Sequence, residues 1–290
     1  MTGPRSASAL AHAKLNLTLR ITGVRDDGMH LLDSLMCSIS LADRITLTER
    51  SDEIVTVETK GADIGPDFAN LALKAAKVFQ EEFGGAGYDI VLEKEIPAGA
   101  GLGGGSADAA ATLRLARDIS GREASDAQLV EIGAELGADI PFCLSGGLAR
   151  VSGIGDVLRP KEMHEALYDA VVVLGIPNFA MPTGDVFAAW DRNPASGTPD
   201  VVPACLAQVA DRFVNDLEPP AESLVPELHR LRGALSTAIG SPARMTGSGS
   251  GIFGFARSMR EANKAARRVA GDFAAVLLCR PVRSGVEVLE

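Results

Sequence analysis

Long hydrophobic runs, closely spaced cysteines and a secretory signal are all missing from this sequence of 290 residues. The longest wholly apolar stretches, such as Ala170–Leu174, are far too short to cross a bilayer, and the first residues lack the continuous apolar segment of a signal peptide. Cysteines that stand singly argue against a zinc site or a disulfide framework, and they favour a reducing compartment. The four cysteines are Cys37, Cys143, Cys205 and Cys279. We therefore expect a cytoplasmic protein with no membrane partner.

Basic charge and aromatic side chains are also scarce. The formal net charge is −10, and aromatic residues make up 4% of the chain. An acidic surface repels a polyanion, and base-stacking platforms need aromatic rings, so we expect no nucleic-acid partner. The remaining composition, 46% hydrophobic and 23% charged, is that of an ordinary globular protein with one large domain or two modest ones. We expect a monomer or a weak homodimer.

Glycine, in contrast, is in excess. The chain has 31 glycines, where average usage would give about 20. They gather in three clusters, at Gly99–Gly105, Gly146–Gly155 and Gly247–Gly254, whereas a flexible linker would spread them. Because strand and helix patterns separate the clusters, the glycines belong to particular loops of a folded protein.

The first half of the chain contains clear strand and helix patterns. Alternating residues predict a half-buried strand over Ala13–Ile21, with Lys14 and Asn16 on its polar face. Asp26-Asp27-Gly28 is typical of a turn. Further strands are expected within Asp43–Glu58, over Tyr88–Ile96 and over Leu148–Val151. Helices are expected over Asn70–Phe83, over Ala107–Ile119 with Ser106 as its cap, and over Asp126–Leu136 with Ser125 as its cap.

The second half mixes strands and helices without a regular βαβ alternation. Strands are expected over Asp169–Ile176, over about 250–256 and at the end, and helices over about 204–214, about 223–238 and Ser258–Phe273. This mixture favours an α+β fold over a doubly wound parallel sheet. Charge rises between Arg159 and Leu167. We place a boundary there, which gives domains of residues 1–160 and 161–290, with the last strand a candidate to return to the first domain.

The first glycine cluster lies between a predicted strand and a predicted helix. Such a loop can turn its backbone N–H groups inward, and the helix behind it adds partial positive charge, so the pair is typical of a phosphate site. A P-loop is excluded because Gly105 stands where that motif needs lysine. Gly99, Gly101 and Gly104 fit the dinucleotide pattern G-x-G-x-x-G, but the strand before them is charged and a proline intervenes. A nicotinamide-dependent oxidoreductase therefore stays a weak alternative.

The segment Pro97-x-Gly-x-Gly-Leu-Gly-Gly-Gly-Ser-Ala-Asp-Ala-Ala resembles the phosphate loop of the galactokinase, homoserine, mevalonate and phosphomevalonate (GHMP) kinase superfamily. Six further segments, in order, resemble one branch of that superfamily, which belongs to the non-mevalonate pathway of isoprenoid (terpenoid) biosynthesis. They are Ala13–Leu17, Asp27-Gly28 with His30, Asn70-Leu71, Gly137–Phe142, Asn215–Glu218 and Met245–Ser250. The resemblance covers nearly the full chain and implies a two-domain α+β fold. Its N-terminal mixed domain places the glycine loop before a helix, and its C-terminal domain packs an antiparallel sheet with helices.

The activity that this resemblance implies is phosphoryl transfer from ATP, with Mg2+, to an alcohol. The implied acceptor is the 2-hydroxyl of 2-C-methylerythritol that carries a diphosphocytidyl group, a small-molecule partner. By resemblance Asp139 is the general base and Lys14 is the cation beside it. A neighbouring ammonium would keep the carboxylate ionised and favour the developing alkoxide. From the residues alone, Asp139 could instead be a loop carboxylate that binds backbone N–H groups, and Lys14 a solvated surface lysine.

The resemblance also implies which residues bind ATP. Asn70 and Lys94 would lie near the adenosine, and the glycine loop would hold the phosphates. The loop residues in question are Pro97, Gly99, Gly101, Leu102, Gly103, Gly104, Gly105 and Ser106. Ser106 is also the best candidate for a Mg2+ contact, because no dedicated carboxylate cluster is visible in the sequence. Asp108 is expected in the first turn of the helix, where its negative charge interacts favourably with the helix dipole, and it is not expected to be a ligand.

The substrate side is implied in the same way. Asn16 shares the face of Lys14 and would contact substrate, and His30 resembles the histidine that reads the cytosine ring. Phe187 matches one aromatic of the pair that sandwiches the base, whereas Met29 stands where the other is commonly tyrosine. The third glycine loop, with Gly247, Ser248 and Gly249, would lie beside the substrate phosphates, or would be a tight turn between strands.

The alternatives that stay open are another GHMP kinase, acting on homoserine or a mevalonate derivative, and a silent nucleotide-binding protein on the same fold. Lys14 with Asn16, the Asp-Gly-x-His segment and Asp139 within Gly-Ala-Asp-Ile-Pro-Phe all favour the cytidyl substrate.

Overall fold

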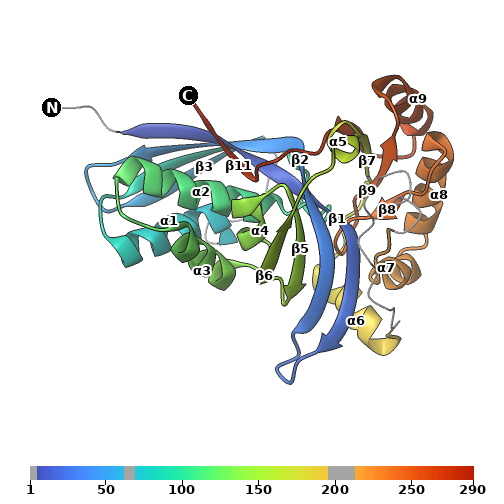
Figure 1. The fold of residues 1–290 in the computed structure, drawn as a ribbon, viewed down its shortest axis with the longest axis horizontal. Helices are drawn as coiled ribbons and strands as arrows, with labels where there is room; N and C mark the ends of the chain where they lie inside the picture. Colours follow the sequence, from blue (N-terminus) through green and yellow to red (C-terminus); the bar gives the residue numbers. More distant parts are fainter. Residues whose placement is uncertain (1–4, 62–68, 195–212) are drawn as a thin grey trace.

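The computed structural model describes residues 5–61, 69–194 and 213–290 and arranges them around two β-sheets (Figure 1). The strands are β1 (Ser6–Val24), β2 (His30–Glu49), β3 (Val55–Gly61), β4 (Tyr88–Lys94), β5 (Leu148–Gly153), β6 (Val157–Lys161), β7 (Val171–Ile176), β8 (Arg244–Met245), β9 (Ile252–Ala256), β10 (Ala275–Cys279) and β11 (Val286–Leu289). The helices are α1 (Leu71–Phe83), α2 (Gly104–Ser120), α3 (Asp126–Leu136), α4 (Ile140–Ser145), α5 (Glu165–Tyr168), α6 (Thr183–Arg192), α7 (Glu218–Leu224), α8 (Glu227–Ile239) and α9 (Met259–Val269).

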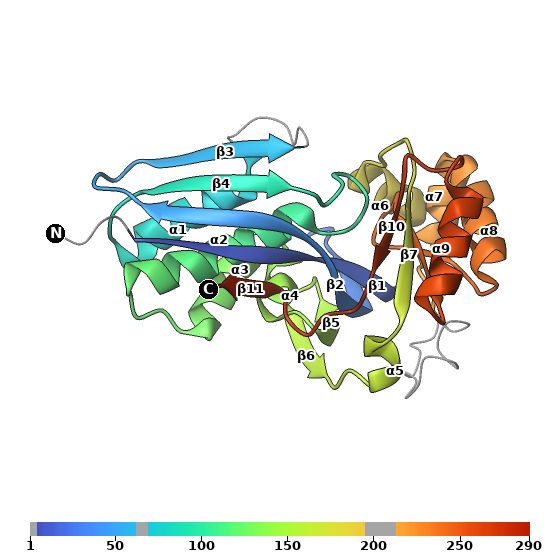
Figure 2. The ribbon, with the colours of Figure 1, turned by 90° about the horizontal axis from the view of Figure 1, so that it is seen from above.

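The larger sheet has the strand order β11-β1-β2-β4-β3, and β5 and β6 attach through β2. Only β3 and β4 pair in parallel; the other described pairs of this sheet are antiparallel. Helices α1, α2 and α3 lie on one face of the sheet, as the two perpendicular views show (Figure 2). Strand β11 pairs with β1, so residues 286–289 complete the sheet that the first strand begins.

The smaller sheet is antiparallel, with the order β10-β7-β9-β8, and helices α8 and α9 pack on it (Figure 1). Beneath them is a second hydrophobic core, which includes Leu19 and Ile21 near the far end of β1. The long β1–β2 hairpin therefore reaches from the first core into the second. This is the α+β architecture that the sequence predicts, with an antiparallel C-terminal sheet covered by helices.

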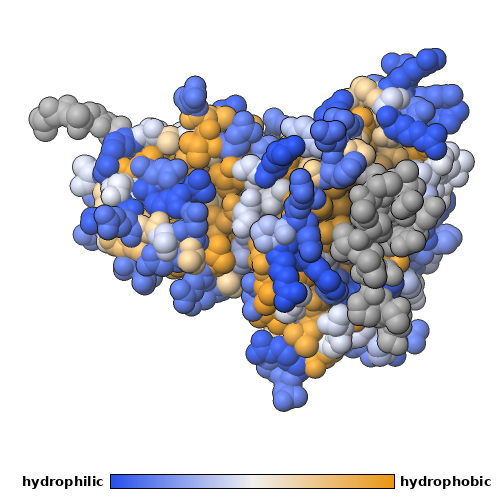
Figure 3. All heavy atoms as spheres, viewed as in Figure 1, coloured by the Kyte–Doolittle hydropathy of each residue, from blue (hydrophilic) through white to orange (hydrophobic). Residues whose placement is uncertain are grey.

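Helix α9 presents a basic face to solvent. Arg260, Lys264, Arg267 and Arg268 are exposed along it, while Ala262, Ala265 and Val269 are buried. Hydrophilic side chains gather over this helix (Figure 3). The strict division between the two faces explains why the helix was readily predicted from the sequence, as Ser258–Phe273.

Most of the predicted elements are confirmed within a few residues. Helix α3 carries the predicted cap, because Ser125 and Gln128 form a reciprocal capping box. The turn at 26–28 joins β1 to β2, whereas the segment Asp43–Glu58 is the end of one long strand and part of β3. The helix predicted over 204–214 lies almost wholly outside the described residues, as does Cys205. No described helix is long and apolar enough to span a membrane.

Two predictions near the glycine loop are wrong. Ser106 does not cap α2, because the helix begins at Gly104 and Gly103 occupies the cap position with a left-handed φ of 71°. The strand around Lys14 is not half-buried either: Lys14 and Asn16 are 4% and 5% exposed. The reason is tertiary, because two glycine loops fold over the face that the alternation leaves polar.

Candidate active site

A cavity of about 580 Å³ lies between the β1–β2 hairpin, the glycine loop before α2 and helix α6. It collects most of the residues that the sequence singled out. Those that line it are Lys14, Asn16, Met29, His30, Gly101, Gly103, Ser106, Asp139, Phe187, Gly247 and Ser248. The remaining predicted residues, Asn70, Lys94, Pro97, Gly99, Leu102, Gly104, Gly105 and Gly249, are outside its lining.

The glycine loop and the third glycine loop are packed backbone to backbone. Gly101 has a φ of 70°, and a Cβ placed on it would lie 2.2 Å from the carbonyl oxygen of Thr246. Ser250 and Gly251 donate their N–H groups to the carbonyls of Gly99 and Ala100, at 3.3 and 3.1 Å. Only glycine permits this approach, so the two loops form one rigid wall of the cavity.

Helix α2 points an uncapped N-terminus at the cavity. Gly103 at the cap position has no side chain, and no side-chain oxygen accepts from the first-turn N–H groups. Ser106, in that first turn, lines the cavity. Free N–H groups and the helix dipole make this end of the cavity suited to an anion such as phosphate.

Lys14 and Asp139 meet at the floor of the cavity. The Lys14 Nζ lies 3.3 Å from Oδ2 of Asp139 and donates a hydrogen bond of 2.7 Å to Oδ1 of Asn16. Asn16 in turn donates to Ser34 Oγ at 2.9 Å, which orients its amide. A Cβ on Gly103 would lie 3.0 Å from Cγ of Lys14, so the glycine loop also presses against the lysine stem. The ammonium is therefore fixed rather than solvated.

Asp139 stands just before helix α4, but its side chain makes no capping hydrogen bond. The side chain is 37% exposed, whereas that of Lys14 is 5% exposed. The sequence alone left open that the Asp139 carboxylate caps the helix by accepting from backbone N–H groups, and the structure shows no such capping bond. One oxygen faces a buried ammonium, and the group remains accessible to a ligand in the cavity.

The segment Asn215–Glu218 holds the third glycine loop from behind. Asn215 donates to the carbonyls of Met245 and Gly247 at 2.9 and 2.8 Å, and Glu218 accepts from the Met245 N–H at 2.9 Å. Burial raises the pKa of the Glu218 carboxyl above its ordinary value. The sequence identified this motif but no role for it; its contacts show that it positions the loop.

Lys94 lies in a buried cluster of ion pairs. Its ammonium is 3% exposed and is enclosed by the carboxylates of Asp43 and Asp108, the latter at 2.5 Å. Burial alone would lower the pKa of Lys94, but the two carboxylates raise it above its ordinary value. Asp43 also accepts from the N–H groups of Glu95 and Ile96, at 2.6 and 2.8 Å. Lys94 therefore ties β4 to β2 and α2 and does not supply a free positive charge to phosphate.

The predicted nucleotide residues outside the cavity support its wall. Asn70 caps α1 by accepting from the N–H groups of Ala72 and Leu73, at 2.9 and 3.4 Å. A Cβ on Gly105 would lie 3.6 Å from Leu71, so the start of α1 is beside the start of α2. Leu102 accepts from the Lys14 N–H at 2.9 Å.

At the other end of the cavity, His30 packs against two aromatic side chains of helix α6. Its ring lies 4.6 Å from the ring of Phe187 and 5.7 Å from that of Trp190, measured between centroids. Its Nε2 is 2.8 Å from Oδ1 of Asp191. Met29 is 46% exposed beside it. The sequence patterns missed Asp191 and Trp190, because no motif marks them and only the helical spacing from Phe187 could have suggested them.

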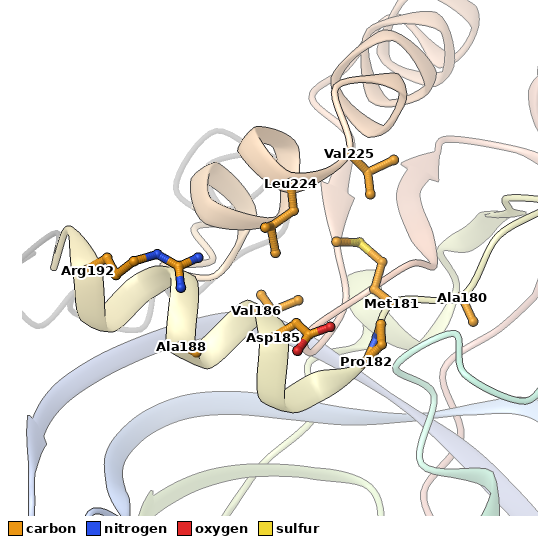
Figure 4. Close-up of a pocket in the computed structure, with 9 residues that line it drawn as sticks. All are labelled: Ala180, Met181, Pro182, Asp185, Val186, Ala188, Arg192, Leu224 and Val225. Carbon is orange, nitrogen blue, oxygen red and sulfur yellow. The ribbon is translucent and has the colours of Figure 1, made fainter.

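Helix α6 also separates this cavity from a second one of about 240 Å³. The opposite face of the helix lines that second space, where Val186 faces Leu224 and the Asp185 side chain points toward Pro182 (Figure 4). Thr183, at the start of α6, is hydrogen-bonded to Ser248 of the third glycine loop at 2.9 Å between the hydroxyl oxygens. The helix is thereby linked at its first turn to the phosphate end of the site.

The described residues contain no group of three or more histidine, cysteine, aspartate or glutamate side chains arranged to hold a metal ion. The cavity lining offers one carboxylate, Asp139, and the hydroxyls of Ser106, Thr183 and Ser248, of which Ser106 is in the first turn of α2. Hard oxygen donors of this kind fit a Mg2+ ion that arrives with phosphates and keeps several waters, and do not fit a dedicated protein cage.

Comparisons with known proteins show the family of this chain. The family of the GHMP kinases N terminal domain matches residues 70–147, and the GHMP kinases C terminal family matches residues 203–275. A 4-diphosphocytidyl-2-C-methyl-D-erythritol kinase of Cereibacter sphaeroides is 40% identical over 89% of this chain and 92% of its own, and one of Moorella thermoacetica is 37% identical over 93% and 97%.

Solved structures give the same result. A crystal structure of a 4-(cytidine 5'-diphospho)-2C-methyl-D-erythritol kinase has a TM-score of 0.80 and 35% identity, covering 94% of this chain and 98% of its own. A homoserine kinase from Cytophaga hutchinsonii, at 19% identity and a TM-score of 0.76 over 100% of this chain and 99% of its own, shares the fold. The chain belongs to the GHMP kinases and, within them, to the family of 4-diphosphocytidyl-2-C-methyl-D-erythritol kinases.

Proposed function

We propose that this kinase transfers the γ-phosphoryl group of ATP to the 2-hydroxyl of 4-diphosphocytidyl-2-C-methyl-D-erythritol. The observation that carries the proposal is the Lys14–Asp139 pair, 3.3 Å apart, in the same cavity as the uncapped N-terminus of α2. A proton acceptor, a fixed cation and an anion site are thus side by side. The names of the full-length relatives supply the substrate.

The donor end would bind the phosphates through backbone groups. The glycine loop and the first turn of α2 present N–H groups that need no side chain and carry no net charge. This accounts for phosphate binding by a protein whose net charge is −10. Mg2+, when bound with ATP, neutralises charge on the phosphate oxygens, and Ser106 and Asp139 are the protein oxygens best placed to contact it.

The acceptor end would remove one proton. As the bond forms between the substrate oxygen and the γ-phosphorus, the bond from that phosphorus to the ADP oxygen breaks, and the hydroxyl proton passes to the Asp139 carboxylate. The Lys14 ammonium, held by Asn16 at 2.7 Å, would stabilise the negative charge that develops on the attacking oxygen. His30, Phe187 and Met29 would bind the cytosine at the far end.

The test compares acceptors and then removes the base. With ATP, the protein should release ADP in the presence of the cytidyl compound and not with homoserine or mevalonate; phosphorylation of mevalonate alone would reject the proposed substrate. Asp139→Asn should lower kcat by about 10³-fold, with little change in the KM for ATP. Asp185→Asn, a matched loss of one carboxylate on the outer face of α6, should leave kcat within about twofold, since Asp185 is outside the cavity lining.

A further inference from the structure

His30 is anchored by a side chain that the sequence motifs do not include. Its Nε2 lies 2.8 Å from Oδ1 of Asp191, while Phe187 and Trp190 contact the ring. All three partners come from helix α6, and Phe187 and Asp191 are four residues apart, on one face of the helix. The imidazole side chain is 15% exposed, so a single helix fixes both its position and one of its nitrogens.

This contact determines what the second ring nitrogen offers to a ligand. An ionised carboxylate can only accept hydrogen bonds, so His30 must donate from Nε2 to Asp191. A neutral imidazole has a single N–H, and that proton is then on Nε2. The partner on one nitrogen thereby sets the tautomer. Nδ1 is consequently an acceptor on a residue that lines the cavity.

Cytosine and uracil differ in what they present to such an acceptor. Cytosine carries an amino donor at position 4, whereas uracil carries a carbonyl acceptor there. The lone pair on Nδ1 would accept a hydrogen bond from the cytosine amino group, and it would repel the uracil carbonyl oxygen. Uracil could offer only its N3–H, and that would move the base by about one atom and displace the reacting hydroxyl from Asp139.

We propose that Asp191 is a specificity-determining positioning residue: by holding His30 as the Nε2–H tautomer, it makes Nδ1 the acceptor for the cytosine amino group and excludes uridyl substrates. This inference rests on the proposed function, because it assumes that the cytidyl compound is the substrate. Asp191 acts through His30 and does not itself contact the base. Its own side chain is 47% exposed, so replacing it should not disturb the fold.

The first experiment measures base preference in the full-length protein. The kcat/KM for 4-diphosphocytidyl-2-C-methyl-D-erythritol is divided by that for its uridyl counterpart, in the wild type and in Asp191→Asn and Asp191→Ala. Asparagine can donate or accept and so no longer selects a tautomer. The wild-type ratio should fall about tenfold in both variants, chiefly through a higher KM for the cytidyl compound, with the KM for ATP unchanged. Asp185→Asn, on the other face of the same helix, should keep the wild-type ratio.

The second experiment observes the tautomer directly. In protein labelled with 15N-histidine, the His30 signals are assigned by their loss in His30→Gln. The wild type should show an unprotonated Nδ1 and a protonated Nε2, and Asp191→Asn should show exchange between the two tautomers. A wild-type His30 that is protonated on Nδ1, or on both nitrogens, would overturn the inference.

The outcomes separate the two proposals. If the wild type does not phosphorylate the cytidyl compound, the proposed function fails. If it does, and both Asp191 variants keep the wild-type base preference, the role of Asp191 fails while the proposed function stands.

Discussion

The two ends of the cavity are built from different parts of the protein. The phosphate end consists of backbone, from two glycine loops and a helix terminus, and outside the cavity lining it is supported by buried ion pairs in which Lys94 is 3% exposed. The base end consists of side chains on a hairpin tip and one helix, where Met29 and Asp191 are about half exposed. Triphosphate geometry is the same for every ATP, so a rigid backbone frame suffices there. A base is selected by its edge, and the described groups at this end of the cavity are the side chains of His30, Phe187 and Met29.

The sharpest test of this difference removes the buried cation that supports the phosphate end from outside the cavity lining. Lys94→Met leaves the Asp43 and Asp108 carboxylates buried without their partner, so it should lower the free energy of unfolding by about 3–5 kcal/mol. Urea unfolding would measure it. Lys60→Met, which removes an exposed lysine 3.8 Å from Glu58, is the control and should change stability by less than about 0.5 kcal/mol. Similar losses in the two variants would contradict the framework role.

The backbone contact between the two glycine loops gives the next largest effect. Gly101→Ala would place a Cβ 2.2 Å from the Thr246 carbonyl oxygen at a positive φ, so it should cost about 2–3 kcal/mol and raise the KM for ATP. Thermal unfolding and ATP kinetics measure the two consequences. Gly233→Ala, inside helix α8 with nothing within 4 Å of its Cβ, should instead stabilise the protein by about 0.5–1 kcal/mol. A Gly101→Ala protein with wild-type stability would show that the loops are not rigidly packed.

The pH dependence of stability probes the same buried group. Burial raises the pKa of the Asp108 carboxyl to about 7, and the nearby Asp43 carboxylate opposes the pull of Lys94. The folded state therefore holds a proton that the unfolded state has released above its ordinary pKa, so this contribution is present at low pH and is lost as the pH rises through about 7. From pH 5 to 7 the loss approaches at most about 1.4 kcal/mol per pH unit. Asp108→Asn should flatten the dependence of Tm on pH; an unchanged slope would contradict it.

Substitutions at the base end should change substrate binding and have little effect on the stability of the protein. Phe187→Ala removes the ring beside His30, so it should raise the KM for the cytidyl compound about tenfold and leave the KM for ATP unchanged. Steady-state kinetics with each substrate varied in turn would measure both values. Equal changes in the two KM values would mean that the two ends are not independent.

Local pattern was enough for much of the fold. The capping box at Ser125, the alternation around Lys14 and the glycine loop before α2 were all visible in short stretches of sequence, because each depends on neighbours along the chain. The wrong predictions have distant causes. Ser106 was predicted as the cap, but Gly103 occupies that position and the helix begins at Gly104. Lys14 was predicted on an exposed face, but the loops that contain Gly103 and Gly247 pack against it.

The candidate site divides in the same way. Lys14 and Asp139 were predicted from motifs, and they do meet in the cavity. The partners of Lys94 were not predicted, because Asp43 and Asp108 are 51 and 14 residues away. Asp191 was missed because no motif marks it and its contact with His30 spans 161 residues. Pairings at that separation have no local pattern, so a single sequence could not reveal them.

The pairing of β11 with β1 has a consequence for how the chain reaches this structure. It joins Ser8 to Leu289 and Ala11 to Val286, so all strands of the smaller sheet lie between these two partners in the sequence. Until the late strand arrives, one edge of β1 offers unpaired N–H and C=O groups to any extended segment nearby. Closing so long a loop is entropically slow. Until its last residues are in place, the protein therefore exposes to aggregation an edge of the strand that carries Lys14.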